Sequence, residues 1–134
     1  MSTQSLAQLV EDALGGLSAP VFDTDVVGSQ GLPWIVFVTG LPSPSERALG
    51  RSVHARTGRV LVKCAAATGH GARLLGDEVD AALEGAQFTP AGWRLGPLEL
   101  VNVREPSADY EVTTTTSNHP VVQILEYVFT AIRG

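Results

Sequence analysis

The sequence predicts an α+β domain of two layers, in which two helices pack against a mostly antiparallel sheet. Two segments, residues 6–17 and 72–83, place apolar residues three and four positions apart, which is helical spacing. Two others, residues 59–66 and 121–132, are rich in apolar residues and alternate with the period of a strand. Helix, strands, helix, strands is the resulting order. We expect one domain over residues 1–134, which suffices to bury roughly two-thirds of the unfolded surface.

The first helix is predicted from an apolar stripe made by Leu6, Leu9, Val10, Ala13, Leu14 and Leu17. Ser2, Thr3 or Ser5 can cap its start, and Gly15-Gly16 ends it. The stripe covers one side of the helix only. It therefore needs a sheet or a neighbouring subunit to bury it.

Two strands follow the first helix. Residues 21–27 predict a short strand whose Asp23 and Asp25 share a face, which suits an edge or a solvent face. Residues 28–33 form a turn by composition. Residues 34–39 are apolar on both faces and predict an inner strand.

Residues 40–51, GLPSPSERALGR, have the composition of a loop. A strand over residues 52–56 can follow, separated from the next strand by Thr57-Gly58. A hairpin and one long bulged strand both agree with this pattern.

Residues 59–85 predict a strand that leads directly into a helix. Val60, Val62, Cys64 and Ala66 alternate with more polar neighbours, so we expect them to face the core. Ala72, Leu75, Val79, Ala82 and Leu83 then recur at helical spacing. Thr68 is the expected N-cap, and Gly85 lies where the helix should stop.

The last third of the chain predicts a turn at Phe88–Trp93, a strand at Leu98–Val103 and a long strand at Val121–Ile132. The long strand is apolar on both faces, so we expect helices or another subunit to cover both. Within it, Glu126 requires a partner, such as Lys63 or an arginine of a neighbouring chain, or else an exposed edge. Residues 105–119 are polar without periodicity, which suits a mobile arm or an extended edge segment.

Composition excludes several classes of function. The net charge is −5 and the nine basic residues are scattered, which argues against a nucleic-acid-binding surface. One cysteine excludes an internal disulfide and a multi-cysteine metal site. No apolar run reaches 18 residues, and the N-terminus lacks the basic region of a signal peptide. We expect a soluble protein of a reducing compartment.

Two glycine-containing stretches are candidates for anion sites. Starting at Gly40, a phosphate-binding loop would need Gly and Lys where Ser45 and Glu46 stand, and a carboxylate there repels phosphate. Thr68-Gly69-His70-Gly71 opens a helix, where backbone N–H groups can hold an anion. Its glycines are better explained by a tight strand-to-helix turn.

Catalytic and metal sites are equally weakly supported. Cys64 is the only possible thiol nucleophile, and His54, His70 and Asp77 are the only residues that could act as its base and orienting group. Cys64 alternates in step with the core-facing residues of its strand, so it is expected to be buried. A metal site would have to use Asp23, Asp25, His119 and Glu126, and their spacing matches no recognisable metal-ligand motif. We therefore expect no enzyme, no metal and no cofactor.

The charged loop at residues 43–56 is the remaining candidate. It is either a solvated loop or a docking surface, and exposed arginines are common interface anchors. The interface residues that we predict there are Ser45, Glu46, Arg47, Arg51, His54 and Arg56.

Four strings and the closing strand together resemble the tail terminator (tail-completion) proteins of long-tailed bacteriophages. The strings are LAQLVEDALGGL, SERALGRS, VLVKCAAATGHGARLLGDEVDAALEG and FTPAGWRLGPLEL, and the closing strand is VVQILEYVFTAI. The resemblance covers most of the chain. It departs at residues 105–119, where a shorter connection rich in Asp and Pro is expected.

The resemblance implies a structural, non-enzymatic virion protein of the phage tail or neck, assembled in the host cytoplasm. It would form a homo-oligomeric ring, usually a hexamer, that ends tail-tube growth. Its partners would be the tail tube protein and the head–neck connector. DNA would only pass through the lumen, since an acidic ring repels phosphates. The alternatives are a head–tail connector or head-closure protein, a small enzyme using Cys64, and a monomeric binding adaptor.

Overall fold

The computed structural model describes residues 5–24, 31–40, 55–90, 92–104, 106–108 and 119–133. Two helices and seven strands confirm the predicted α+β class. In chain order they are α1 (Leu6–Leu14), β1 (Val21–Asp23), β2 (Trp34–Gly40), β3 (Ala55–Ala66), α2 (Gly69–Leu83), β4 (Trp93–Leu95), β5 (Glu99–Val103), β6 (Ser107–Ala108) and β7 (Val121–Arg133).

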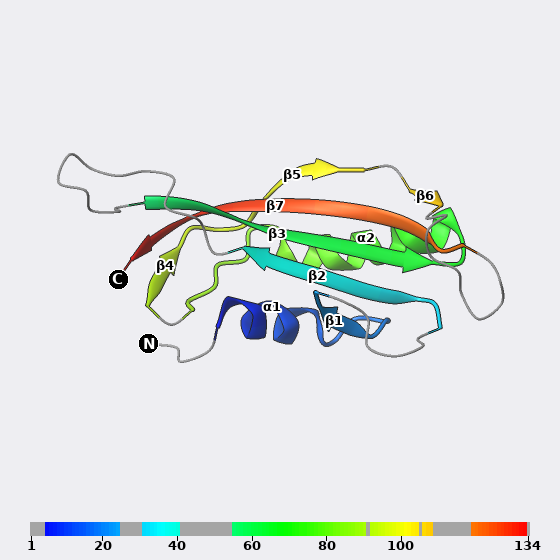
Figure 1. Cartoon of the computed structure of the whole chain (residues 1–134), viewed down its shortest axis with the longest axis horizontal. Coiled ribbons are helices and arrows are strands. Elements are labelled where there is room, and N and C mark those ends of the chain that lie inside the picture. The colour runs from blue at the N-terminus through cyan, green and yellow to red at the C-terminus, as the bar shows by residue number, and fades with distance from the viewer. Residues whose placement is uncertain are drawn as a thin grey trace.

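The sheet is built around two long central strands (Figure 1). Its order is β1-β2-β3-β7-β4, and β5 and β6 pair with β7 as well. Only β1 and β2 run parallel, so the sheet is mostly antiparallel, as predicted. β3 and β7 pair along their whole length, from Ala55 opposite Ile132 to Ala66 opposite Val121. The predicted edge position of β1 and inner position of β2 are both confirmed.

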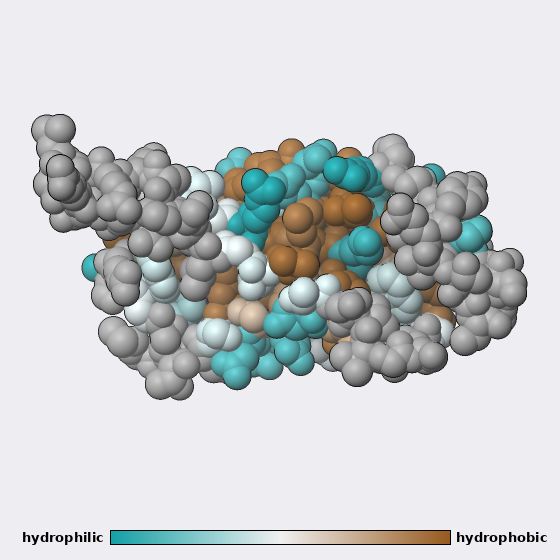
Figure 2. All heavy atoms as spheres, in the orientation of Figure 1, coloured by the Kyte–Doolittle hydropathy of each residue, from teal (hydrophilic) through white to brown (hydrophobic). Residues whose placement is uncertain are grey.

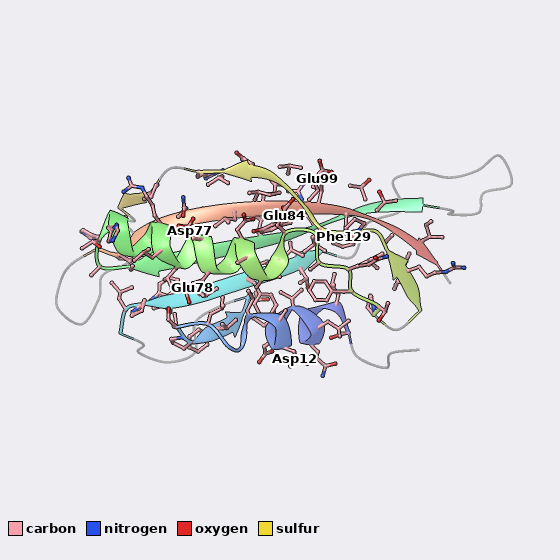
Figure 3. All side chains as sticks on the ribbon, turned by 180° about the vertical axis from the view of Figure 1, so that it is seen from behind. Asp12, Asp77, Glu78, Glu84, Glu99 and Phe129 are labelled. Atoms are coloured by element: carbon pink, nitrogen blue, oxygen red, sulfur yellow. The ribbon has the colours of Figure 1, made fainter. Side chains whose placement is uncertain are left out.

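Both helices lie on one side of the sheet, and the main core is buried between the two layers (Figures 1 and 3). The alternating residues of β3 predicted to face the core do so, and Cys64 is completely buried among them. The stripe of α1 packs here too, so the sheet of its own chain buries it. Main contributors are Leu6, Val10, Leu14, Ile35, Phe37, Val60, Val62, Leu75, Val79, Leu83, Leu125, Tyr127 and Phe129.

The helix ends follow local sequence chemistry. Ser5 is the N-cap of α1, and its hydroxyl accepts from the Gln8 backbone N–H while the Gln8 side chain accepts from the Ser5 N–H. The Thr68 hydroxyl accepts from the Gly71 N–H at the start of α2, as predicted. Beyond α2, Gly85 has φ +74°, the left-handed conformation that favours glycine.

Of the two alternatives for this region, the structure has the one long strand and not the hairpin, because β3 runs through Thr57 and Gly58. The expected bulge is absent, since β3 pairs with β7 without a shift of register. Gly58 lies opposite Phe129, whose ring occupies the space that a Cβ at Gly58 would need. The same Cβ would lie 2.7 Å from the Gly40 carbonyl oxygen. An aromatic ring over a glycine restores the packing that glycine lacks in a strand. The sequence pattern alone does not predict that Gly58 and Phe129 lie opposite each other.

Two short strands were also not predicted. β4 follows the turn at residues 88–93 and pairs with the end of β7. β6 pairs with the start of β7, so the extended-edge interpretation of residues 105–119 holds at Ser107–Ala108. Residues 109–118 lie outside the described ranges, as do residues 25–30 of the predicted strand and turn. None of the described helices is long and apolar enough to cross a membrane.

Candidate functional site

Most of the predicted interface residues lie outside the described ranges. This applies to Ser45, Glu46, Arg47, Arg51 and His54. Arg56 instead belongs to β3, paired with Ala131, so the loop ends before the residue at which we predicted its end. The neighbouring end of β2 is Gly40, which lies opposite Arg59. Gly40 of β2 and Ala55 of β3, which border residues 41–54 in the sequence, both belong to the sheet.

The geometry of Cys64 argues against a thiol nucleophile. Its side chain is fully buried between the layers, whereas His70 and Asp77 of α2 are exposed. Burial raises the pKa of the thiol to about 12, and the charge of Glu78 adds to the effect. A thiol with such a pKa is protonated at neutral pH and is a poor nucleophile. Cys64 is therefore a core residue, as its phase predicted.

The residues considered as metal ligands are not assembled into a site. Among the described residues, no group of three or more His, Cys, Asp or Glu can hold a metal ion. Asp25 lies outside those residues. Glu126 instead forms an ion pair with Arg59, with 3.4 Å between Oε2 and Nη1. Arg59 was not considered as this partner, although it lies two residues from Leu61, which faces Glu126 across β3 and β7.

The start of α2 is occupied by its own cap. The Thr68 hydroxyl accepts a hydrogen bond from the Gly71 N–H, so one of the donors that an anion would use is already bonded. Beside it lies an open pocket of about 350 Å³ whose lining includes Leu32, Pro33 and Leu74. The Glu78 carboxylate in its wall accepts from the Ser18 N–H at 3.1 Å and from the Ser18 hydroxyl at 2.6 Å. These contacts indicate a structural role for this turn.

The side of the sheet opposite the helices is the strongest candidate for a functional surface. We call it the helix-free face, and Figure 2 shows it from the front, with apolar residues gathered at its centre. We predicted that helices or another subunit would cover both faces of β7, and neither of the two described helices lies on this side, so cover by another subunit stays a prediction. The face comprises a second apolar cluster and several more exposed residues: Phe22, Leu32, Trp34, Val36, Val38, Leu61, Ala65, Val122, Ile124, Val128 and Ile132.

Exposure on the helix-free face varies along the strands. Trp34 and Ala65 are buried, whereas Val38 is 42% exposed and Ile132 is 50% exposed. Large apolar side chains left in water over adjacent strands commonly mark a protein-binding surface. The Arg59–Glu126 pair lies on this same face, among them. The exposed end of the face is therefore suited to a protein contact.

The opposite, helical side of the molecule is acidic (Figure 3). Two carboxylates of α2 and that of its C-cap residue, Glu84, are engaged within the chain. Glu78 binds Ser18, Asp80 accepts from the Tyr127 hydroxyl at 2.8 Å, and Glu84 accepts from the Leu100 N–H at 2.8 Å. Asp77 is exposed and makes no hydrogen bond or ion pair within the described part of the chain. Exposed carboxylates of α1, including Glu11 and Asp12, extend the acidic surface.

Comparison with solved structures identifies the fold in other proteins. A chain in the virion of a native gene transfer agent particle aligns with TM-score 0.64 at 16% identity, over 97% of this chain and 96% of that one. A second solved protein aligns with TM-score 0.56 at 14% identity, over 92% of this chain and 86% of the other. No protein-family model and no curated protein matches the sequence. At these identities the likeness establishes a shared fold.

Proposed function

We propose that this chain is a structural protein of a phage-like virion, and that its role is that of a tail terminator. The single observation that supports this best is the fold, which is shared over nearly the full length of both chains with a component of a gene transfer agent virion. The sequence resemblance to tail terminators supports the narrower role independently of the fold comparison. Fold alone does not specify function, so the surfaces of the molecule must also suit the role.

Two surfaces of the described residues agree with a ring. A cyclic ring brings one patch of each subunit against a different patch of the next. The helix-free face exposes apolar side chains suited to such a contact. The helical side also carries exposed carboxylates on α1, Glu11 and Asp12, and an acidic surface there toward the lumen would let DNA pass without binding. In this proposal the ring ends the growth of the tail tube and joins it to the head–neck connector.

The proposal is tested by locating the protein in assembled particles. Gold-labelled antibody against the chain, viewed by electron microscopy, should mark one site per particle where tail meets head. Particles made without the protein should carry tubes of uncontrolled length that are not joined to heads. Labelling of the head portal, with tails of normal length when the protein is absent, would assign a head-closure role. Labelling of neither position would refute a virion role.

A further inference from the structure

Lys63 places a positive charge in apolar surroundings on the helix-free face. Its cross-strand neighbours are Val36 on β2 and Ile124 on β7. The side chain is half-buried, and no described carboxylate lies within ion-pair distance, since Glu126 pairs with Arg59. An ammonium group that loses more water when a partner covers this face needs a compensating negative charge. The partner should therefore bring a carboxylate surrounded by apolar groups.

The outer side of α2 carries such a group. Asp77 is exposed and makes no hydrogen bond or ion pair within the described part of the chain, unlike Glu78, Asp80 and Glu84. Leu74 is one turn before it and is 51% exposed, the most exposed large apolar side chain of the described residues. Residues three and four apart share a helix face, so Leu74, Asp77 and the exposed Ala81 form one stripe.

We propose that the partner is a second copy of this chain, whose α2 stripe packs on the helix-free face and sets Asp77 against Lys63. Lys63 lies on the helix-free face and Asp77 on the helical side (Figure 3), so these two charges cannot pair within one copy. A contact between them repeats from copy to copy and closes into a ring when the rotation permits. This inference rests on the proposed ring and adds which faces form it.

The test is a charge exchange in the full-length chain, followed by sedimentation velocity over a range of protein concentrations. Wild type should form species larger than a dimer. Lys63→Glu and Asp77→Lys should each raise the concentration needed for association by at least about tenfold, because each sets like charges together. Combining both substitutions should restore association to within about threefold of wild type. Thermal melting monitors the fold of every variant.

One variant controls for charge alone. Glu11→Lys makes the same charge change as Asp77→Lys at an exposed position of α1. It should associate as wild type does, and restoration by the double variant controls for Lys63→Glu. Single variants that assemble normally, or a folded double variant that stays dissociated, would overturn the proposed contact.

A wild-type chain that is monomeric at every concentration would also overturn the contact, and would leave the helix-free face to a different partner. These results are separable from the virion proposal. A ring found at the tail end but insensitive to both charge changes would keep the function and reject the interface. Association that depends on these charges, in a protein that is absent from particles, would keep the interface and reject the virion function.

Discussion

At the scale of single residues, the long central strand depends on a glycine that sequence patterns treat as a break. Gly58 is tolerated in β3 because the Phe129 ring covers it from the neighbouring strand. Cys64, six residues further along, is the opposite case. Its burial followed directly from its phase with Val60 and Val62. Contacts set by alternation within one strand were predictable, whereas the contact between Gly58 and Phe129 depends on the register between two strands.

Gly58→Ala should destabilise the protein by about 1–3 kcal/mol, because the added methyl overlaps the Phe129 ring and approaches the Gly40 carbonyl oxygen. Urea denaturation followed by circular dichroism measures the change. Gly40→Ala is the matched control, since a Cβ there meets only atoms at ordinary contact distance, 3.9 Å. Equal stability of the Gly58→Ala variant and wild type would contradict the packing described.

The buried thiol predicts a loss of stability in alkali. The pKa of Cys64 rises from 9.0 to about 12 on folding, so the folded state retains a proton that the unfolded state releases. The free energy of unfolding should therefore decline as the pH rises from about 9 toward 12. Burial and the hydrogen bond to Asp80 also raise the pKa of Tyr127, which steepens the decline. The Cys64→Ala variant should show a shallower decline than wild type in urea titrations between pH 8 and 11, and identical slopes would count against this.

At the scale of elements, the strong periodic segments were predictable and the short strands were not. Both helices, their caps and the long final strand follow from apolar spacing and local cap chemistry. β4 and β6 have three and two residues, too few for a period to be recognised, and exist because β7 offers them backbone partners. Glu126 forms its ion pair with Arg59, which lies diagonally across from it on the neighbouring strand. Predicting this pair from the sequence would again require the register between β3 and β7.

The contribution of the contact between β7 and α2 to stability can be measured by removing one hydroxyl group, that of Tyr127. Tyr127→Phe removes the 2.8 Å hydrogen bond to Asp80 while keeping the ring, and should cost about 1.5 kcal/mol. Asp77→Asn, one turn earlier on the same helix and without a partner in the described residues, should leave unfolding within about 0.5 kcal/mol of wild type. Thermal and urea unfolding both report the difference. A Tyr127→Phe variant as stable as wild type would show that water replaces the tyrosine hydroxyl as the hydrogen-bond partner of Asp80.

At the scale of the whole molecule, the sequence resemblance predicted a structural role, which stays a proposal, whereas the comparison with solved structures establishes the fold alone. Five of the six predicted interface residues lie outside the described ranges and stay a prediction, and the described residues add a second candidate, the exposed apolar face. Composition could not identify that face. It arises because β3 and β7 are apolar on both sides while both helices cover the same side.

The charged loop remains a prediction that can be tested directly. Reversal of Arg47 and Arg51 to glutamate should block docking to the tail tube or neck, because exposed arginines anchor protein interfaces. The fold should remain intact by circular dichroism. The measurement is the fraction of particles with joined, uniform tails when this variant replaces wild type. Normal tail assembly would remove the loop from the docking surface.

The central position of β7 has a consequence for synthesis. It is the last described strand to leave the ribosome, yet β3, β4, β5 and β6 all pair with it. Until residues 121–133 emerge, the nascent chain holds a sheet without its middle strand and with β3 unpaired on one side. Such exposed edges favour aggregation. The core is therefore completed only after β7 has emerged, and folding is limited by contacts between strands distant in sequence.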